Sequence, residues 1–473
     1  MSTIEEIIRT AHREHDHPNE GESSQIDGFV ELINRQLGDV KQIPQLSKAT
    51  RPLSLVSFRC LLQDTGYPME VYLPGDGVSE SDVDWSKLKE RWVGWGVEIP
   101  GEQSWAKGGN VEEGVSSLPT SVHAKYPLPG SKGDYIGALV KVYEDAAFKP
   151  ASTHHFLGIL SSSPLPSNEP ENAEMVPTIH VLRRVEEAEA EPVEDVREEL
   201  VNYLATAFTP PDRVAGEYLL LLLLSSPTSR PTSMTPLGTL SVNFKRKDEL
   251  ATARFGEVVG AVTPRVVPIP LSVSLLHSHP FFPSSTDSSS LDAGLLQLSE
   301  GTVLVVEEDA MGSGGQLNEK AVKNLKALAE CMTEQRLRYE YPYMEGLKMD
   351  CATRVVVLSQ GKSLLPVDID IPVKGTGEVD LTRQDLSALR NYLGRLSSLE
   401  HAMKLEIPDD TAELIQDAFI QGRKENAESA EETLKRRMKV ARLMALSYPE
   451  AKLTKEVWDK VVKMDEEAVA RKL

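Results

Sequence analysis

The stretch Leu291–Asp309, LDAGLLQLSEGTVLVVEED, decides the fold class of the second half of the chain. We expect a helix near Leu291–Leu298 and a strand at Val303–Glu307, where three valines and a leucine stand together. A helix that leads into a buried strand is the repeating unit of an α/β fold.

The same alternation continues on both sides of this stretch. Helices are expected at Val193–Phe208, Asp212–Ser226, around Glu249–Val262 and at Asn318–Gln335, and strands at Thr239–Phe244, Val266–Val273 and Arg354–Leu358. The run Leu219–Leu224 has no period, and we predict a helix because leucine favours helices and no β-branched residue is present. Strands separated by helices pair in parallel, so the pattern predicts an α/β sheet covered on both faces. Residues 381–473 are expected to be helical, with a last helix that begins near Thr454.

The first half has a different texture, because its apolar runs are short and separated by Gly, Pro and Ser. These β-like runs are Leu53–Leu62, Met69–Leu73, Trp92–Ile99, Ile136–Tyr143, His155–Leu160 and Thr178–Leu182. Their number and length predict a small closed or partly open β-barrel or a sandwich. We therefore divide the chain into a helical segment at 1–47, a β-rich domain at 48–184 with a polar loop at 161–177, an α/β domain at 185–380 and a helical domain at 381–473.

Composition limits the possible functions. The formal charge of −21 disfavours a broad nucleic-acid surface, which needs clustered Lys and Arg, and points to protein partners instead. The N-terminus lacks the apolar core of a secretory signal, and the longest aliphatic run, Tyr218–Leu224, is far shorter than the roughly 20 residues of a membrane span. Three widely spaced cysteines show no metal-binding spacing and predict reduced, buried thiols.

Two groups of histidines are close in sequence. His12, His15 and His17 could supply two zinc ligands, but an exposed polar face is the more common reason for such a group. His277 and His279 have no third ligand nearby, and we interpret them as the end of a strand. We predict no metal site and no cofactor.

The β-rich half contains four tryptophans, Trp85, Trp92, Trp95 and Trp105. Aromatic side chains among basic ones would favour the stacking of nucleic-acid bases. Here glutamates stand between the tryptophans, which favours core packing and a protein contact.

The only Gly-Lys-Ser of the chain, at Gly361–Ser363, follows a predicted strand and resembles part of a P-loop. A P-loop needs an earlier glycine, where this chain has Val356, and a helix that begins at the lysine. Pro366 follows closely, and VDIDIP after it alternates like a strand. The sequence therefore predicts a turn without a phosphate site.

The α/β half as a whole resembles the ATPase core of the minichromosome maintenance (MCM) helicases, a branch of the AAA+ ATPases. In that frame Glu307 and Glu308 stand where the family places its Mg²⁺- and water-handling acids, and Ser359 and Gln360 stand at the sensor position. The loop after Thr239–Phe244 would hold the P-loop, but it reads KRKDELATARFG, without glycines at the cradle and without a Lys-Ser pair. The arginine-finger motif is also absent. The resemblance implies a degenerate ATPase fold in which these four residues do not act in catalysis.

A narrower resemblance extends over residues 45–473. The segments SLVSFRCLLQD, VEIPGEQSW, YPLPGSKG, TPLGTLSVNF and GKSLLP occur in this order in the MCM complex-binding protein family. This resemblance implies an oligonucleotide-binding-like barrel, a degenerate AAA+ core and a helical lid. It also implies a nuclear, non-enzymatic protein that binds MCM subunits and regulates their assembly, supply or chromatin release in DNA replication and sister-chromatid cohesion.

Two other functions remain open at the level of the sequence. One is an active ATPase that uses a non-standard loop at Lys245–Glu249, and the other is a single-stranded DNA binder that acts through the barrel. The chain lacks the long polar insertion of the animal members, and the short basic triplets Lys245–Lys247 and Lys435–Arg437 are the remaining candidates for nuclear import. Such triplets are most often solvated surface.

Overall fold

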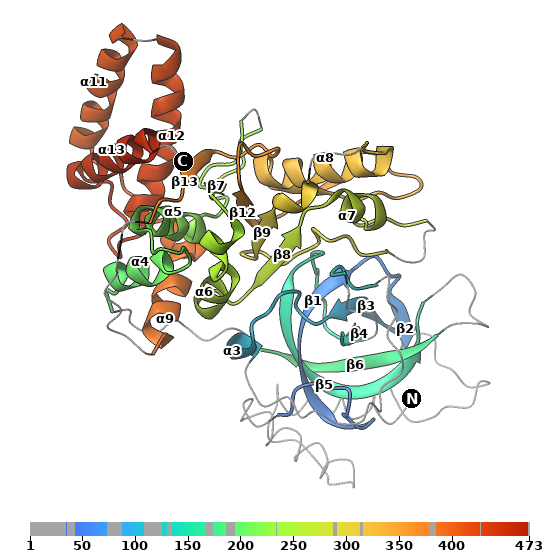
Figure 1. Cartoon of the computed structure of the whole chain (residues 1–473). Helices are drawn as coiled ribbons and strands as arrows, with labels where there is room; N and C mark the ends of the chain where they lie inside the picture. Colours follow the sequence, from blue (N-terminus) through green and yellow to red (C-terminus); the bar gives the residue numbers. More distant parts are fainter. Residues whose placement is uncertain are drawn as a thin grey trace, which may run out of the picture.

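The computed structural model describes most of the chain (Figure 1). The described residues are 35, 43–72, 88–107, 125–129, 135–166, 174–185, 194–232, 234–286, 291–312, 316–375, 377, 385–425 and 427–471. The helix predicted within 1–47 lies almost entirely outside these residues, as do Trp85 and the three N-terminal histidines.

The first part of the chain forms a sheet that closes on itself. Its strands are β1 (Leu55–Asp64), β2 (Glu70–Tyr72), β3 (Lys89–Val97), β4 (Gly137–Val142), β5 (Thr153–Pro164) and β6 (Met175–Arg184). The order is β1-β5-β6-β4-β3-β2, and β1 also pairs with β3, so five strands close a barrel and β2 extends one edge. All six predicted strands are confirmed, and the closed form is the one adopted.

The predicted loop at 161–177 is shorter than expected. Residues 161–164 belong to β5 and residues 175–177 to β6, where they pair in an antiparallel ladder. Ser161 Oγ lies 2.8 Å from Nε2 of the buried His180, so a polar residue in this strand still has a partner. Serine-rich composition alone therefore gave a wrong boundary.

The barrel tryptophans are core residues. Trp92 packs with Phe58, Phe156 and Val140, and Trp95 is fully buried against Leu139 and Tyr135. The interpretation of these two tryptophans as packing residues is confirmed. Cys60 is also in this core, and all three cysteines of the chain are buried and unpaired by disulfides, as predicted.

The second part is built on a parallel five-stranded sheet. Its strands are β7 (Val242–Lys245), β8 (Val266–Pro270), β9 (Val303–Glu307), β12 (Arg354–Ser359) and β13 (Ile369–Pro372). The order is β13-β7-β12-β9-β8, and every pairing is parallel. Alternate residues supply two cores: Val303, Val305 and Val356 face one, and Leu304 and Val306 face the other. The prediction of a sheet covered on both faces is confirmed.

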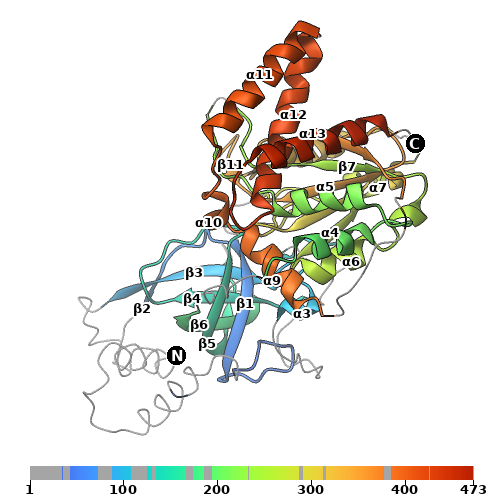
Figure 2. The ribbon, with the colours of Figure 1, turned by 90° about the vertical axis from the view of Figure 1, so that its left-hand side faces the viewer.

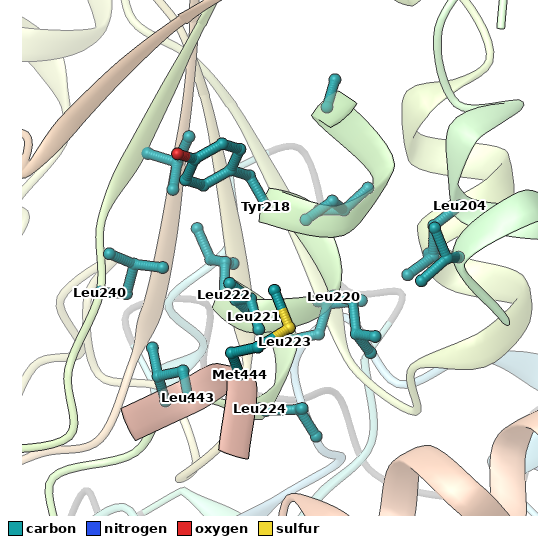
Figure 3. Packing of buried hydrophobic residues seen from close by; sticks show 14 of the residues in the cluster. Leu204, Tyr218, Leu220, Leu221, Leu222, Leu223, Leu224, Leu240, Leu443 and Met444 are labelled. Atoms are coloured by element: carbon teal, nitrogen blue, oxygen red, sulfur yellow. The ribbon is translucent and has the colours of Figure 1, made fainter. Parts of the chain in front are cut away.

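The six leucines lie in the helix α5 (Arg213–Leu224), as predicted, and all of them are buried. The helix packs between α4 (Arg197–Ala205), strands β7 and β12, and the last helices of the chain. Figure 3 shows Leu220–Leu224 surrounded by Leu204, Leu240, Leu443 and Met444. A helix that is apolar on every side needs neighbours on every side, and this one has them.

The C-terminal part is helical, as predicted. Its helices are α9 (Ser387–Leu396), α10 (Leu399–Ala402), α11 (Asp409–Glu425), α12 (Ala427–Leu446) and α13 (Lys455–Ala470). Thr454 caps α13, since its hydroxyl accepts a hydrogen bond from the Val457 N–H. Helices α11 and α12 lie side by side and extend away from the sheet (Figures 1 and 2).

The helix predicted near Leu291–Leu298 is wrong. This segment is extended and turned, and its backbone binds the barrel: the Leu291 N–H donates to Asp64 Oδ2 at 2.9 Å, and the Leu291 carbonyl accepts from Lys125 Nζ at 2.6 Å. Gly294 lies against the backbone of Phe282, where an added Cβ would be 2.2 Å from the carbonyl carbon. Tertiary hydrogen bonds therefore replace those of a helix. The short helix of this region is instead α7 (Val273–Ser278), which contains His277 and ends before His279, so the two histidines mark a helix end and not a strand end.

A second junction joins the barrel to the sheet. The Val266 N–H donates to the Gly101 carbonyl, and the Gln103 N–H donates to the Pro264 carbonyl. Gly101 has φ +71°, and a Cβ there would be 2.5 Å from the Val266 carbonyl oxygen. Trp105, in α3 (Ser104–Lys107), donates its indole N–H to the Gly260 carbonyl and lies beneath the Arg390 guanidinium. Trp105 thus makes a protein contact, within its own chain.

Candidate functional site

A cavity of about 710 Å³ lies on one face of the parallel sheet, close to the carboxyl ends of its strands. In an open parallel sheet, ligands bind outside the carboxyl ends, where the strand order reverses. Here that point is beside β7. The connection from β7 runs to β8 at one edge of the sheet, whereas the connection from β12 runs to β13 on the other side of β7. The cavity walls come from β8, β9, β12, the 3₁₀ helix η6 (Glu249–Thr252), the helix α6 (Phe255–Val262) and Gln103.

The loop after β7 is closed by its own side chains. Asp248 Oδ1 accepts a hydrogen bond from the Ala251 N–H, so a carboxylate caps the turn that leads toward α6. The Arg246 guanidinium is buried and binds Thr252 Oγ1 and the Asp309 carboxylate. Lys245 forms an ion pair of 2.9 Å with Asp370. Lys245 and Arg246 are thus already paired with acids.

The charge of the cavity is mainly negative. Four carboxylates line it, from Glu249, Glu257, Glu307 and Asp309, against the single guanidinium of Arg246. Polyphosphate carries the same sign as these acids, so its binding there is opposed by repulsion. The remaining walls include apolar side chains from the strands and from α6.

The two predicted acids, at the end of β9 and directly after it, point to different places. Glu307 is half-buried and lines the cavity. Glu308 is buried and binds the Gly-Lys-Ser turn, since it accepts hydrogen bonds from Ser363 Oγ at 2.7 Å and from the Leu364 N–H at 3.1 Å. Burial raises the pKa of Glu308, and these donors partly oppose that rise.

The sensor-position residues belong to the same turn. Ser359 Oγ lies 2.9 Å from Asn243 Oδ1 and 2.8 Å from the Gly361 carbonyl, whereas Gln360 is exposed. No helix follows Gly361–Ser363, whose residues form a bend before β13, so the prediction of a turn is confirmed. The structure brings Glu308, Ser359 and this turn together, and leaves Glu307 in the cavity and Gln360 in solvent.

Comparison with known families identifies the group to which the chain belongs. The model of a family described as mini-chromosome maintenance replisome factor matches residues 176–472, which is more than half of the sequence. The chain belongs to this family. The match starts in β6 and takes in the parallel sheet, the cavity and the C-terminal helices.

Curated relatives from animals and from a plant share one name. The chain is 26% identical to a mini-chromosome maintenance complex-binding protein of Salmo salar, over 88% of this chain and 88% of that protein. It is 27% identical to the protein of the same name from Homo sapiens, over 72% of this chain and 62% of that protein. The relative of that name from Arabidopsis thaliana is also 27% identical, over 71% of this chain and 63% of its own length.

The ion pair between Arg246 and Asp309 was not predicted from the sequence. Both residues lie in the region that the family model matches. The triplet Lys245–Lys247 looks like solvated surface, but only Lys247 is fully exposed. The second triplet is also engaged: Arg436 and Arg437 both bind the buried Asp465 carboxylate. Ion pairing across distant elements leaves no signal in a local window of sequence.

The described residues show neither a metal-binding cluster nor a membrane-spanning helix. Within them no three His, Cys, Asp or Glu side chains come together in a way that could hold a metal ion. No helix in the same part of the chain combines the length and the apolar character needed to cross a membrane.

The Gly-Lys-Ser turn provides a direct test of these roles. Replacing Glu308 by alanine should lower the free energy of unfolding by about 1–3 kcal/mol, because Ser363 and Leu364 lose their acceptor. Lys362 is exposed, so Lys362→Ala should change that energy by no more than about 0.5 kcal/mol. Urea unfolding of both variants measures the difference. Equal losses, or a larger loss for Lys362→Ala, would show that the lysine holds something in this turn.

Proposed function

We propose that this member of the family is a non-catalytic binding protein for subunits of the MCM helicase. It acts in DNA replication by regulating the assembly, supply or chromatin release of the MCM complex, and through this in sister-chromatid cohesion, and it works in the nucleus. The names of its relatives, each called a mini-chromosome maintenance complex-binding protein, support the partner. The observation that carries the non-catalytic part is the loop after β7, where Asp248 and the Arg246–Asp309 pair occupy the position of a phosphate cradle.

We further propose that the barrel is an oligonucleotide-binding-like fold and that the parallel sheet with its C-terminal helices is a degenerate AAA+ core with its lid. Two features support this: the closure of five strands in the barrel, and the order of the parallel sheet, in which the first strand, β7, lies between the last, β13, and the fourth, β12. A chain with the shape of a subunit, but without its chemistry, binds MCM subunits through surfaces like those between neighbours in the ring. Such a contact should bury at least about 1,000 Å².

Two observations favour a protein partner over single-stranded DNA. Trp92 and Trp95 are in the barrel core and cannot stack on bases, and Trp105 packs against Arg390. The formal charge of −21 also disfavours the binding of DNA phosphates.

Size-exclusion chromatography of the purified chain with each individual MCM subunit tests the proposal. At least one subunit should elute with the chain in an earlier peak, and the shift should survive at moderate salt if apolar contacts contribute. If no subunit and no subcomplex comigrates, while labelled single-stranded DNA does, the DNA-binding function replaces this one.

The absence of ATP chemistry has its own test. Millimolar ATP with Mg²⁺ should leave the melting temperature unchanged, because a ligand that binds only the folded state must stabilise it. Thermal denaturation with and without nucleotide measures this directly. A rise of several degrees that disappears in Lys245→Ala would contradict the proposal and support the non-standard loop.

A further inference from the structure

The cavity beside β9 contains polar groups that the fold does not use. The carboxylates of Glu249 and Glu307 have no hydrogen-bond or ion-pair partner among the described residues, although both line the cavity. Arg246 is only 4% exposed, and its Nε has no acceptor in that same part of the chain, while its other two nitrogens bind Thr252 and Asp309. Glu249 is exposed and Glu307 is half-buried, so both carboxylates can accept from a ligand that brings donors, and the buried Arg246 Nε is a donor that the described part of the fold leaves unsatisfied beside them.

Apolar side chains also line the cavity. Phe255, Val305 and Leu358 contribute to its walls, and Leu250 stands at its edge with 74% of its surface exposed. These apolar side chains can pack against the aliphatic stem of an incoming residue.

We propose that this cavity receives an arginine or lysine side chain carried on a loop of a partner protein. The proposal rests on the function proposed above, in which that partner is an MCM subunit. The aliphatic stem of the basic residue lies along the apolar walls, and its charged end binds Glu307, with Glu249 nearby at the rim.

The electrostatics select this ligand over a nucleotide. Asp309 is already neutralised by Arg246, and Glu257 has Arg254 within 3.4 Å, which leaves Glu307 and Glu249 as the free acids. A cation entering here gains two acids that no other group satisfies, whereas a phosphate would have to displace the Arg246–Asp309 pair. The cavity thus lies where a nucleotide would bind in an ATPase of this fold, but it favours a cation over a phosphate.

The decisive variants change Glu307 alone. Glu307→Gln keeps the shape and removes the charge, so the dissociation constant for the MCM subunit identified by chromatography should rise about tenfold. Glu307→Lys adds repulsion and should raise it by about 100-fold or more. Asp459→Lys, an equal charge change at an exposed position of α13, should leave the constant within about twofold. Biolayer interferometry gives the constants, and thermal denaturation confirms that each variant is folded.

A small probe separates this inference from the proposed function. Saturation-transfer NMR with N-acetyl-arginine methylamide should show transfer to the wild-type chain and to Asp459→Lys, but not to Glu307→Lys. If the wild-type chain binds no MCM subunit but shows this pattern, the proposed partner is wrong and the cavity assignment stands. If an MCM subunit binds wild type and Glu307→Lys equally, or the probe gives the same signal with both, the cavity assignment is overturned while the proposed function stands.

Discussion

Replacing Glu217 by alanine should lower the free energy of unfolding by about 3–5 kcal/mol, because the buried Arg197 guanidinium then keeps only the exposed Glu198 as a counter-charge among the described residues. Arg197 and Glu217 are 2% and 6% exposed, and their side chains meet through two hydrogen bonds, the shorter being 2.6 Å. Arg197 also binds Ser447, and Lys460 lies 3.1 Å from Glu217. The pair therefore ties α4 and α5 to the C-terminal helices.

Urea unfolding of Glu217→Ala measures this loss, and the matched control is the double replacement Glu217→Leu with Arg197→Met. An apolar pair of similar volume removes both charges together and should recover most of the loss. If the double variant is as unstable as Glu217→Ala, packing and not the unpaired charge explains the effect.

The same pair makes stability depend on pH. Burial by itself raises the pKa of Glu217, but Arg197 and Lys460 outweigh burial and hold it below the ordinary value of 4.5. A depressed carboxyl pKa contributes stability that is present above the unfolded value and lost as pH falls through the folded value. Wild type should therefore lose stability below about pH 4.5 more steeply than Glu217→Leu/Arg197→Met.

Replacing Asp64 by alanine should have the second largest effect, a loss of about 3 kcal/mol concentrated at the junction between the barrel and the sheet. Asp64 is buried and accepts hydrogen bonds from the Leu291 N–H and the Gly66 N–H, and its carboxylate lies 3.5 Å from Lys125 Nζ. Without it, a buried N–H loses its acceptor and a buried ammonium loses a counter-charge.

The measurement for Asp64→Ala is the difference between the melting temperatures of the barrel and of the second part. In a Trp458→Phe background, tryptophan fluorescence comes from the first part of the chain and reports the barrel through Trp92 and Trp95. Far-ultraviolet circular dichroism is dominated by the helices of the second part. The two transitions should separate in Asp64→Ala more than in wild type, and Asp145→Ala, a change at an acid outside the junction, should not separate them. Coincident transitions in Asp64→Ala would show that the contacts around Gly101 and Trp105 hold the junction alone.

Periodicity and composition predicted most of the elements correctly. The strands at Val303–Glu307 and Arg354–Leu358, the helix of six leucines and the turn at Gly361–Ser363 depend on local preference and on burial on all sides, and both leave a local signal. The parallel sheet followed from the order of those elements. The resemblance to a family, recognised from short collinear segments, was confirmed by the match over residues 176–472.

Only the tertiary structure decided how Leu291–Leu298 folds and what the charged residues do. A leucine-rich segment becomes extended because Asp64 and Lys125, more than 160 positions away, bind its backbone. Glu307 and Glu308 are neighbours in sequence, yet one lines a cavity and the other holds a turn, because the strand ends between them. In the sequence, Arg246 looks like part of a basic surface triplet. In the folded chain it is buried and binds Asp309 and Thr252. Sequence alone determines which segments are strands and helices, since that depends on neighbours along the chain. Which charges are paired, and which remain free to bind a partner, depends on residues that only folding brings together.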